Sequence, residues 1–177
     1  MMKNILFLLL LIATCSVAIE LPIFMIPEKD TGNDIIDVFV EETESYAEIT
    51  VVFKDEDHPN PFTNFFYDIY RFFKYGRVKD IETFFLVVDE EKIKEMRFPG
   101  VYAGSLDYDD TENLHGTITL PAKAFEFKDG RIVIFVNTWN HMFSNKPLKN
   151  VKYVEISDYK VSKGTREDAE KVYSWRH

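Results

Sequence analysis

The chain has 177 residues, a formal net charge of -9 and a 46% share of hydrophobic residues. This length suits one domain with a hydrophobic core, and the acidic balance argues against nucleic acid and anionic membrane surfaces as partners, because both repel negative charge. The only cysteine, Cys15, lies in an apolar N-terminal segment, so the rest of the chain has no disulfide and depends on its core. Gln is absent and charged residues are plentiful, a composition typical of thermophile proteins.

Residues 1–18 have the pattern of a secretory signal peptide. Lys3 supplies the positive start, residues 5–13 are apolar, and Ser16 and Ala18 occupy the small-residue positions of a cleavage site. The apolar run is shorter than the roughly 20 residues that a spanning helix needs. We therefore expect an exported protein, either extracellular or in the cell envelope. An uncleaved signal that anchors the chain to a membrane is the alternative.

Apolar segments predict several strands in the first half of the chain. Residues 35–40 and 82–88 are mostly apolar, as in buried strands, and residues 46–54 alternate with the period of a half-buried strand. Acidic residues at the start of segment 90–96 favour a short helix there. Residues 101–106 predict a further strand.

An aromatic helix is expected between these strands. Two prolines exclude helix from the loop before residue 62, and residues 62–75 then predict a helix that ends at Gly76. One polar stripe of this helix consists of Asn64, Asp68, Arg71 and Tyr75. The apolar remainder consists of Phe62, Phe65, Phe66, Ile69, Tyr70, Phe72 and Phe73.

The second half of the chain contains the clearest local signal. An Asp-Gly pair at residues 129–130 stands between alternating apolar residues, which predicts a hairpin with Lys128 opposite Arg131. Residues 132–136 are apolar on both faces, so we expect this strand to lie centrally in the sheet.

Together these elements predict one α+β domain over residues 19–177. Further strands are expected at residues 115–120 and 151–161, and a capping pattern at Thr165 opens a C-terminal helix. Successive strands joined by short turns favour a mainly antiparallel meander with the aromatic helix inserted. Such a sheet hides its edges by closing as a barrel that resembles the calycins in architecture, or as a sandwich.

The aromatic helix is the leading candidate for a binding site. Its apolar arc exceeds what a one-sided core contact needs, which favours a lid over an apolar pocket, or a patch that touches a lipid or an envelope protein. A helix that only covers one face or end of the sheet is the alternative. The residues expected to contact the ligand are Phe65, Phe66, Tyr70 and Phe73, with Arg71 and Lys74 orienting its head group.

An acidic loop at residues 107–113 is the second candidate site. Asp107, Asp109 and Asp110 offer oxygen ligands to a hard cation such as Ca²⁺, and His115 follows nearby. The glycine and the final glutamate of an EF-hand loop are missing. This hypothesis makes the chain a metal-dependent hydrolase or a cation-stabilised domain.

Catalytic motifs are not evident in the sequence. Ser105 lacks the glycine pattern of a nucleophile elbow, and His58, His115 and His141 do not stand at metal-ligand spacing. These observations favour a non-enzymatic binding or interaction domain over the metal-dependent alternative.

Overall fold

The computed structural model describes residues 19–90 and 92–176, so the predicted signal peptide at residues 1–18 lies outside the described residues. No helix in this described part of the chain is long and apolar enough to cross a membrane. The elements in chain order are β1 (Ile23–Pro27), η1 (Glu28–Asn33), β2 (Ile35–Glu42), β3 (Tyr46–Phe53), α1 (Pro61–Tyr75), β4 (Asp80–Asp89), β5 (Lys92–Tyr102), β6 (Gly116–Pro121), η2 (Ala122–Ala124), β7 (Phe127–Lys128), β8 (Arg131–Val136), β9 (Phe143–Ser144), β10 (Tyr153–Ile156), β11 (Val161–Lys163) and α2 (Arg166–Tyr173).

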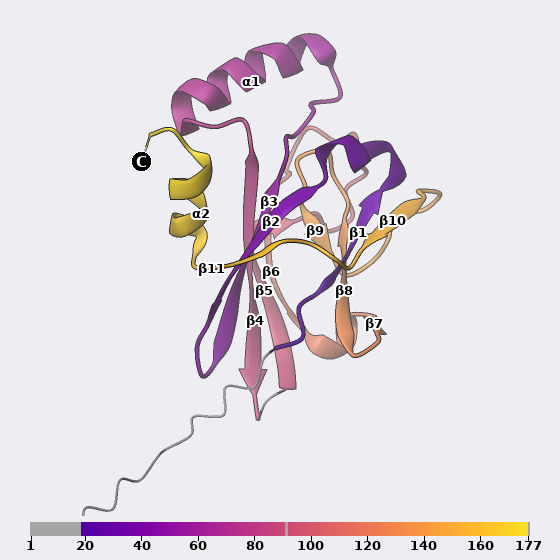
Figure 1. Cartoon of the computed structure of the whole chain (residues 1–177). Helices are drawn as coiled ribbons and strands as arrows, with labels where there is room; N and C mark the ends of the chain where they lie inside the picture. Colours follow the sequence, from indigo (N-terminus) through magenta and orange to yellow (C-terminus); the bar gives the residue numbers. More distant parts are fainter. Residues whose placement is uncertain (1–18, 91, 177) are drawn as a thin grey trace, which may run out of the picture.

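The strands form one curled sheet that resembles a half-barrel (Figure 1). Its order is β10-β1-β8-β9-β5-β4-β3-β2-β11, with β6 beside β5 and β7 beside β8. The prediction of an α+β domain with a barrel-like sheet is confirmed, and its resemblance to calycin barrels stays a prediction. The sheet is mixed rather than a simple meander, because β1 lies parallel to β8, β11 to β2 and β9 to β5. These parallel pairs join segments that are distant in the sequence, so they could not be predicted from the short turns between successive strands.

The predicted helix at residues 90–96 is wrong, because this segment begins strand β5. β4 and β5 form a hairpin in which Asp89 lies opposite Lys92, and the left-handed backbone of Glu90 makes the turn. Met96 and Phe98 are buried while Arg97 between them is exposed, the period of two that a strand imposes. β5 also ends at Tyr102, so no strand covers residues 103–106.

The hairpin, the central strand and the C-terminal helix of the second half are confirmed. The single strand expected at residues 151–161 is wrong, because β10 and β11 are separate strands that pair with β1 and β2. Lys128 lies opposite Arg131 across the Asp-Gly turn, and β8 lies between β1 and β9 with five consecutive buried residues. Thr165 caps α2, with the Asp168 carboxylate accepting hydrogen bonds from the Thr165 backbone and hydroxyl.

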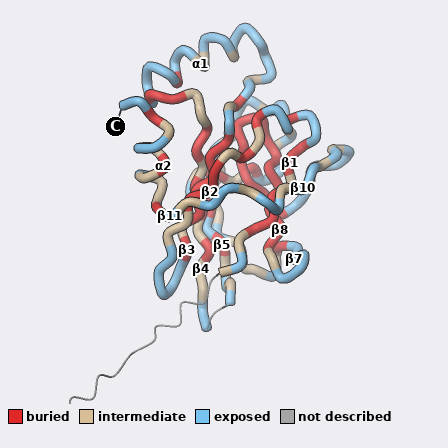
Figure 2. The backbone as a smooth tube through the Cα atoms, in the orientation of Figure 1, coloured by how far each residue is buried: buried red, intermediate tan, exposed pale blue. Residues whose placement is uncertain are grey.

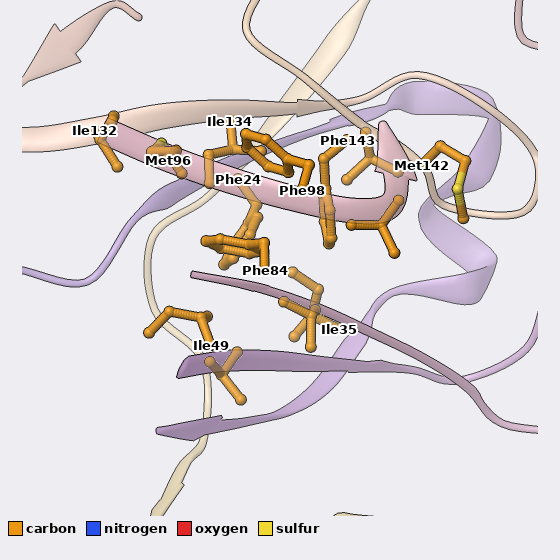
Figure 3. Close-up of a cluster of buried hydrophobic side chains, with 14 of the residues drawn as sticks. Phe24, Ile35, Ile49, Phe84, Met96, Phe98, Ile132, Ile134, Met142 and Phe143 are labelled. Carbon is orange, nitrogen blue, oxygen red and sulfur yellow. The ribbon is translucent and has the colours of Figure 1, made fainter. Parts of the chain in front are cut away.

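Aromatic side chains fill the interior of the curled sheet (Figure 3). Phe84 of β4 lies at the centre, with ring centroids 5.0 Å from Phe143, 5.5 Å from Phe98 and 6.4 Å from Phe24. All four rings are fully buried. Figure 2 shows this buried interior in red, whereas α1 is almost wholly exposed. The domain is therefore held by its sheet, and α1 contributes little to the core.

Candidate functional site

Helix α1 lies across one end of the sheet and is exposed along most of its length (Figures 1 and 2). Its ends match the prediction: the Asn60 side chain accepts hydrogen bonds from the Phe62 and Thr63 backbone, and Gly76 closes the helix in a left-handed conformation. Arg71 is the one buried residue of this helix. The helix is therefore attached to the domain by its polar side.

The apolar side of α1 points to solvent. Phe62 is 75% exposed and Phe73 62% exposed, far above what a core-facing ring retains. We define the aromatic face of α1 as Phe62, Phe65, Phe66, Ile69, Tyr70, Phe72 and Phe73, all of which are exposed. At 100° per residue, Phe62 and Phe73 lie opposite Arg71 on the helix, so the rings are most exposed where the helix faces away from the sheet. An ordinary surface helix has the reverse orientation.

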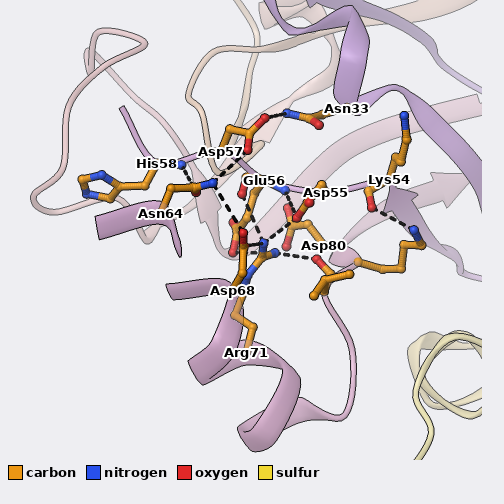
Figure 4. A network of polar contacts seen from close by, with 12 residues as sticks. Asn33, Lys54, Asp55, Glu56, Asp57, His58, Asn64, Asp68, Arg71 and Asp80 are labelled. Atoms are coloured by element: carbon orange, nitrogen blue, oxygen red, sulfur yellow. Dashed lines mark hydrogen bonds and ion pairs between the residues drawn. The ribbon is translucent and has the colours of Figure 1, made fainter. Parts of the chain in front are cut away.

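A buried ion-pair network holds α1 in this orientation (Figure 4). The Arg71 guanidinium lies 2.5 Å from Asp55, 2.7 Å from Asp68 and 3.2 Å from Glu56, and it donates to the Val78 carbonyl at 2.6 Å. Arg71 is only 2% exposed. Although burial alone would lower the pKa of Arg71, these carboxylates raise it, so the guanidinium stays charged.

Hydrogen bonds at the start of α1 extend the network. Asn64 accepts from the His58 backbone at 2.6 Å and donates to Asp57 at 3.0 Å. The Asn33 side chain donates to the other oxygen of Asp57 at 3.0 Å, which connects the loop before α1 to the η1 turn. Polar contacts thus position the helix where a hydrophobic contact would normally do so.

Polar-tipped aromatic residues and cations border the aromatic face at its C-terminal end. Trp175 is 58% exposed, and its ring centroid lies 5.8 Å from that of Phe72. The Lys74 ammonium lies 4.9 Å from the ring centroids of both Tyr70 and Tyr75. The Arg176 guanidinium lies 5.3 Å from the Trp175 ring. The patch therefore has an apolar centre and an amphipathic border.

The structure divides the predicted ligand contacts between two sides of α1. Phe65, Phe66, Tyr70, Phe73 and Lys74 lie together on the exposed side. Arg71 lies on the opposite side and is occupied by carboxylates, so it is not available to orient a ligand on the aromatic face.

The acidic loop is arranged around separate partners. Asp109 pairs with Lys29 at 3.2 Å, and the Asp110 carboxylate accepts from the Asp107 backbone at 2.8 Å. His115 Nδ1 lies 3.0 Å from the Gly100 carbonyl. Across residues 19–90 and 92–176, no group of three or more His, Cys, Asp or Glu residues is placed to hold a metal ion. A Ca²⁺ site in this loop stays a prediction.

His141 is a buried charged group that the sequence does not predict. Its Nδ1 lies 2.9 Å from Asp80, its Nε2 lies 3.4 Å from Asp30, and its ring stacks 3.9 Å from that of Phe53. Burial alone would lower the pKa of His141, but the two carboxylates outweigh it and raise the pKa to about 10. His141 is therefore an imidazolium at neutral pH. His58 is placed separately, with its ring 4.8 Å from that of Trp139.

A polar cavity of about 550 Å³ lies between α1, β4 and β5. From α1 it is lined by Tyr67, Arg71 and Tyr75, the side opposite the most exposed rings of the aromatic face. Its carboxyl groups are Glu48, Glu56, Asp80 and Glu82. Sequence reasoning misses all four because they come from three separate segments; the only signal is an acid at the start of the apolar run that forms β4.

Comparison of the chain with models of protein families, with curated proteins and with solved structures finds no match.

Proposed function

We propose that this protein is an exported, non-enzymatic interaction module that attaches to the interfacial region of a lipid bilayer through the aromatic face of α1. The single observation that carries the proposal is the orientation of α1, which buries Arg71 and exposes the rings. A contiguous exposed apolar patch marks an interaction surface. A helix that holds such a patch outward by a dedicated ion-pair network is suited to insertion into an apolar layer.

The border of the patch favours lipid over a wholly apolar partner. Trp and Tyr rings are enriched where hydrocarbon meets the head groups, and Lys and Arg reach from there toward water. Trp175 lies beside Phe72, with Arg176 next to it, and Lys74 lies over the rings of Tyr70 and Tyr75 at the same end of the helix. An apolar centre, then amphipathic rings and then cations are the groups expected from the hydrocarbon, through the head groups, to the water side of a bilayer interface.

The size of the patch indicates reversible attachment. Burying a phenylalanine side chain fully stabilises by about 1.5–3 kcal/mol, so rings that are already partly covered contribute about 1–2 kcal/mol each. Four rings, Phe62, Phe65, Phe66 and Phe73, then contribute about 4–8 kcal/mol in total. Because the chain is acidic overall, we expect zwitterionic vesicles to bind at least as well as anionic ones.

Co-sedimentation with phosphatidylcholine vesicles tests the proposal. The triple variant Phe62→Ser, Phe66→Ser, Phe73→Ser should partition at least about 100-fold more weakly than the wild type, because three rings are lost from the contact. Phe127→Ser is the matched control: this ring is 50% exposed on β7, at the end of the sheet away from α1 (Figure 1).

Comparing these variants isolates the contribution of α1. Each carries the same residues 1–18, so any vesicle binding by that apolar segment is common to all of them. Unchanged partitioning of the triple variant would contradict the proposal. Failure of folded wild-type protein to bind vesicles would also contradict it, and would leave a partner protein as the occupant of the patch.

A further inference from the structure

The polar cavity beside α1 arises where two neighbouring strands separate. β4 and β5 are paired from Phe85 opposite Arg97 to Asp89 opposite Lys92. Past Arg97, β5 pairs with β6 and then β9, while β4 is paired only with β3 back to Asp80. The cavity of about 550 Å³ is lined by both diverging segments. This volume is within the range of small-molecule sites.

Negative charge dominates the lining of this cavity. Three arginines also line it, but they are shared with carboxylates outside it. Arg71 pairs with Asp55 and Asp68 as well as with Glu56 of the lining, and Arg77 and Arg166 both contact Glu170. The lining carboxyl groups are Glu48, Glu56, Asp80 and Glu82. A buried group of carboxyls with this little positive charge favours either protons or a cationic ligand.

Among the lining carboxyls that form an ion pair, Glu82 has the longest contact. Its side chain is only 13% exposed, and its carboxylate lies 4.0 Å from the Arg166 guanidinium, a long distance for an ion pair. Burial raises the pKa of Glu82, and so does the charge of Asp80, although Arg166 and Arg77 act in the opposite direction. An ammonium group in the cavity would supply the charge that this carboxylate lacks.

Glu56 lies near the same space and is similarly perturbed. Burial, and then the charge of Asp80, raises the pKa of Glu56 to about 8, while Arg71, His141 and a hydrogen bond with Tyr67 lower it. Figure 4 shows Glu56 beside the Arg71 guanidinium, 3.2 Å away. At neutral pH, Glu56 therefore holds a proton that a cationic ligand can displace.

A second observation indicates that the ligand carries an acceptor as well. Arg71 lines the cavity and is 2% exposed, yet its Nε–H has no hydrogen-bond partner among the residues described. A buried donor of this kind requires an acceptor. A neutral hydroxyl oxygen would satisfy it without adding negative charge beside the carboxyls.

We propose that this cavity binds a small organic ammonium compound with neutral hydroxyl groups, the chemistry of an amino alcohol or an amino sugar. The ammonium contacts Glu82, the negative charge of the nearby Asp80 favours it further, and a hydroxyl accepts from Arg71 Nε. The Tyr67, Tyr75 and Phe85 rings in the lining provide aromatic surface for the cation. An organic cation fits better than a divalent metal, because no set of three metal-ligating side chains converges in the described part of the chain. This inference is independent of lipid attachment.

Isothermal titration calorimetry with two matched probes tests the proposal. D-glucosamine and D-glucose have the same ring, and they differ only at carbon 2, where an ammonium group replaces a hydroxyl. We expect glucosamine to bind the full chain with one site at millimolar concentration or below, and glucose to bind at least about tenfold more weakly. At about pH 6, below the pKa of Glu56, binding should release protons, which appear as a dependence of the heat on the buffer.

Two charge variants complete the test. Glu82→Gln keeps the shape of the side chain and should weaken glucosamine binding at least about tenfold. Glu126→Gln removes the same charge from an exposed position outside the lining and should leave binding unchanged. The proposal is overturned by the absence of glucosamine binding, by equal binding of glucose, or by binding that Glu82→Gln does not alter. Binding of Ca²⁺ in a CaCl₂ titration that prevents glucosamine from binding would also overturn the proposal and would favour a metal site.

Discussion

The substitution Arg71→Met tests directly whether polar contacts hold α1 on the domain. Met is similar in length to the aliphatic part of Arg, so the substitution mainly removes the guanidinium group. The variant loses the ion pairs to Asp55, Glu56 and Asp68 and the hydrogen bond to the Val78 carbonyl. At pH 9, above the pKa of Glu56 of about 8, this carboxylate is ionised and only 5% exposed, so it is then left without its cation in a buried position.

The magnitude follows from that uncompensated burial. Removing one partner of a buried ion pair costs about 3–5 kcal/mol, because the other charge stays desolvated. Since Arg71 is the one buried residue of α1, most of this cost should appear as local release of the helix, with the sheet intact. If the free energy of opening α1 falls by about 3 kcal/mol or more, amide exchange in the helix becomes roughly 100-fold faster or more.

Hydrogen–deuterium exchange read by mass spectrometry resolves this effect by segment. Peptides from α1 should exchange at least about 100-fold faster in Arg71→Met, whereas peptides from β3 and β4 should change little. Lys74→Met is the matched control, because it removes one positive charge from the exposed side of the same helix. If α1 exchanges at the wild-type rate in Arg71→Met, the ion-pair network does not hold the helix and the reasoning fails.

Three further predictions concern stability, and each is measurable by urea or thermal unfolding. Phe84→Ala should lower the free energy of unfolding by about 3–5 kcal/mol, because it empties the centre of the aromatic core; a loss below about 1 kcal/mol would be inconsistent with that packing. Gly130→Ala should cost about 1–2 kcal/mol, since Gly130 has a φ of 81° in the hairpin turn, and an unaffected stability would refute the turn geometry. Raising the pH from about 6 to 9 should lower the melting temperature. The folded-state pKa values of Glu56 and His141 are about 8 and about 10, above their unfolded values of 4.5 and 6.5. The stability that these groups contribute at low pH is therefore lost as the pH rises through this window. A melting temperature that rises across the same range would contradict the raised pKa values.

Local signals allow several elements to be predicted from the sequence. The Asp-Gly pair at residues 129–130 specifies its hairpin because only a tight turn with left-handed backbone joins the two flanking strands. The prolines before residue 62 and the glycine at position 76 predict the ends of α1 to within one residue. The period of two in residues 46–53 predicts strand β3, although β3 is buried on both faces from Ile49 to Phe53 and not on one face as expected.

Tertiary contacts decide what the sequence leaves open. Residues 92–96 have helix-compatible composition but pair with β4, because burial of Met96 in the sheet outweighs local propensity. The orientation of α1 could not be predicted, since an aromatic arc on a helix normally turns to the core. The aromatic arc faces outward here because Arg71, on the other side of the helix, forms ion pairs with Asp55 and Glu56 in the loop before the helix.

The candidate sites show the same division. Phe65, Phe66, Phe73 and Lys74 are on the exposed patch, as expected of residues chosen for an apolar arc. Arg71 lies on the opposite side of α1, and the sequence does not reveal that its charge is paired with carboxylates inside the protein. The pairing of His141 with Asp80 spans 61 positions and leaves no local pattern in either segment.

Fluorescence quenching by brominated phosphatidylcholine tests the central claim, insertion of the aromatic face of α1 into a bilayer interface. The chain has two tryptophans: Trp175 is 58% exposed beside Phe72, and Trp139 is 4% exposed. We predict that Trp175 emission is quenched by bromine in the upper acyl chain, and that the quenching disappears in the Phe62→Ser, Phe66→Ser, Phe73→Ser variant. Vesicle-bound protein whose Trp175 emission stays unquenched would show that another surface makes the contact, and would contradict the account.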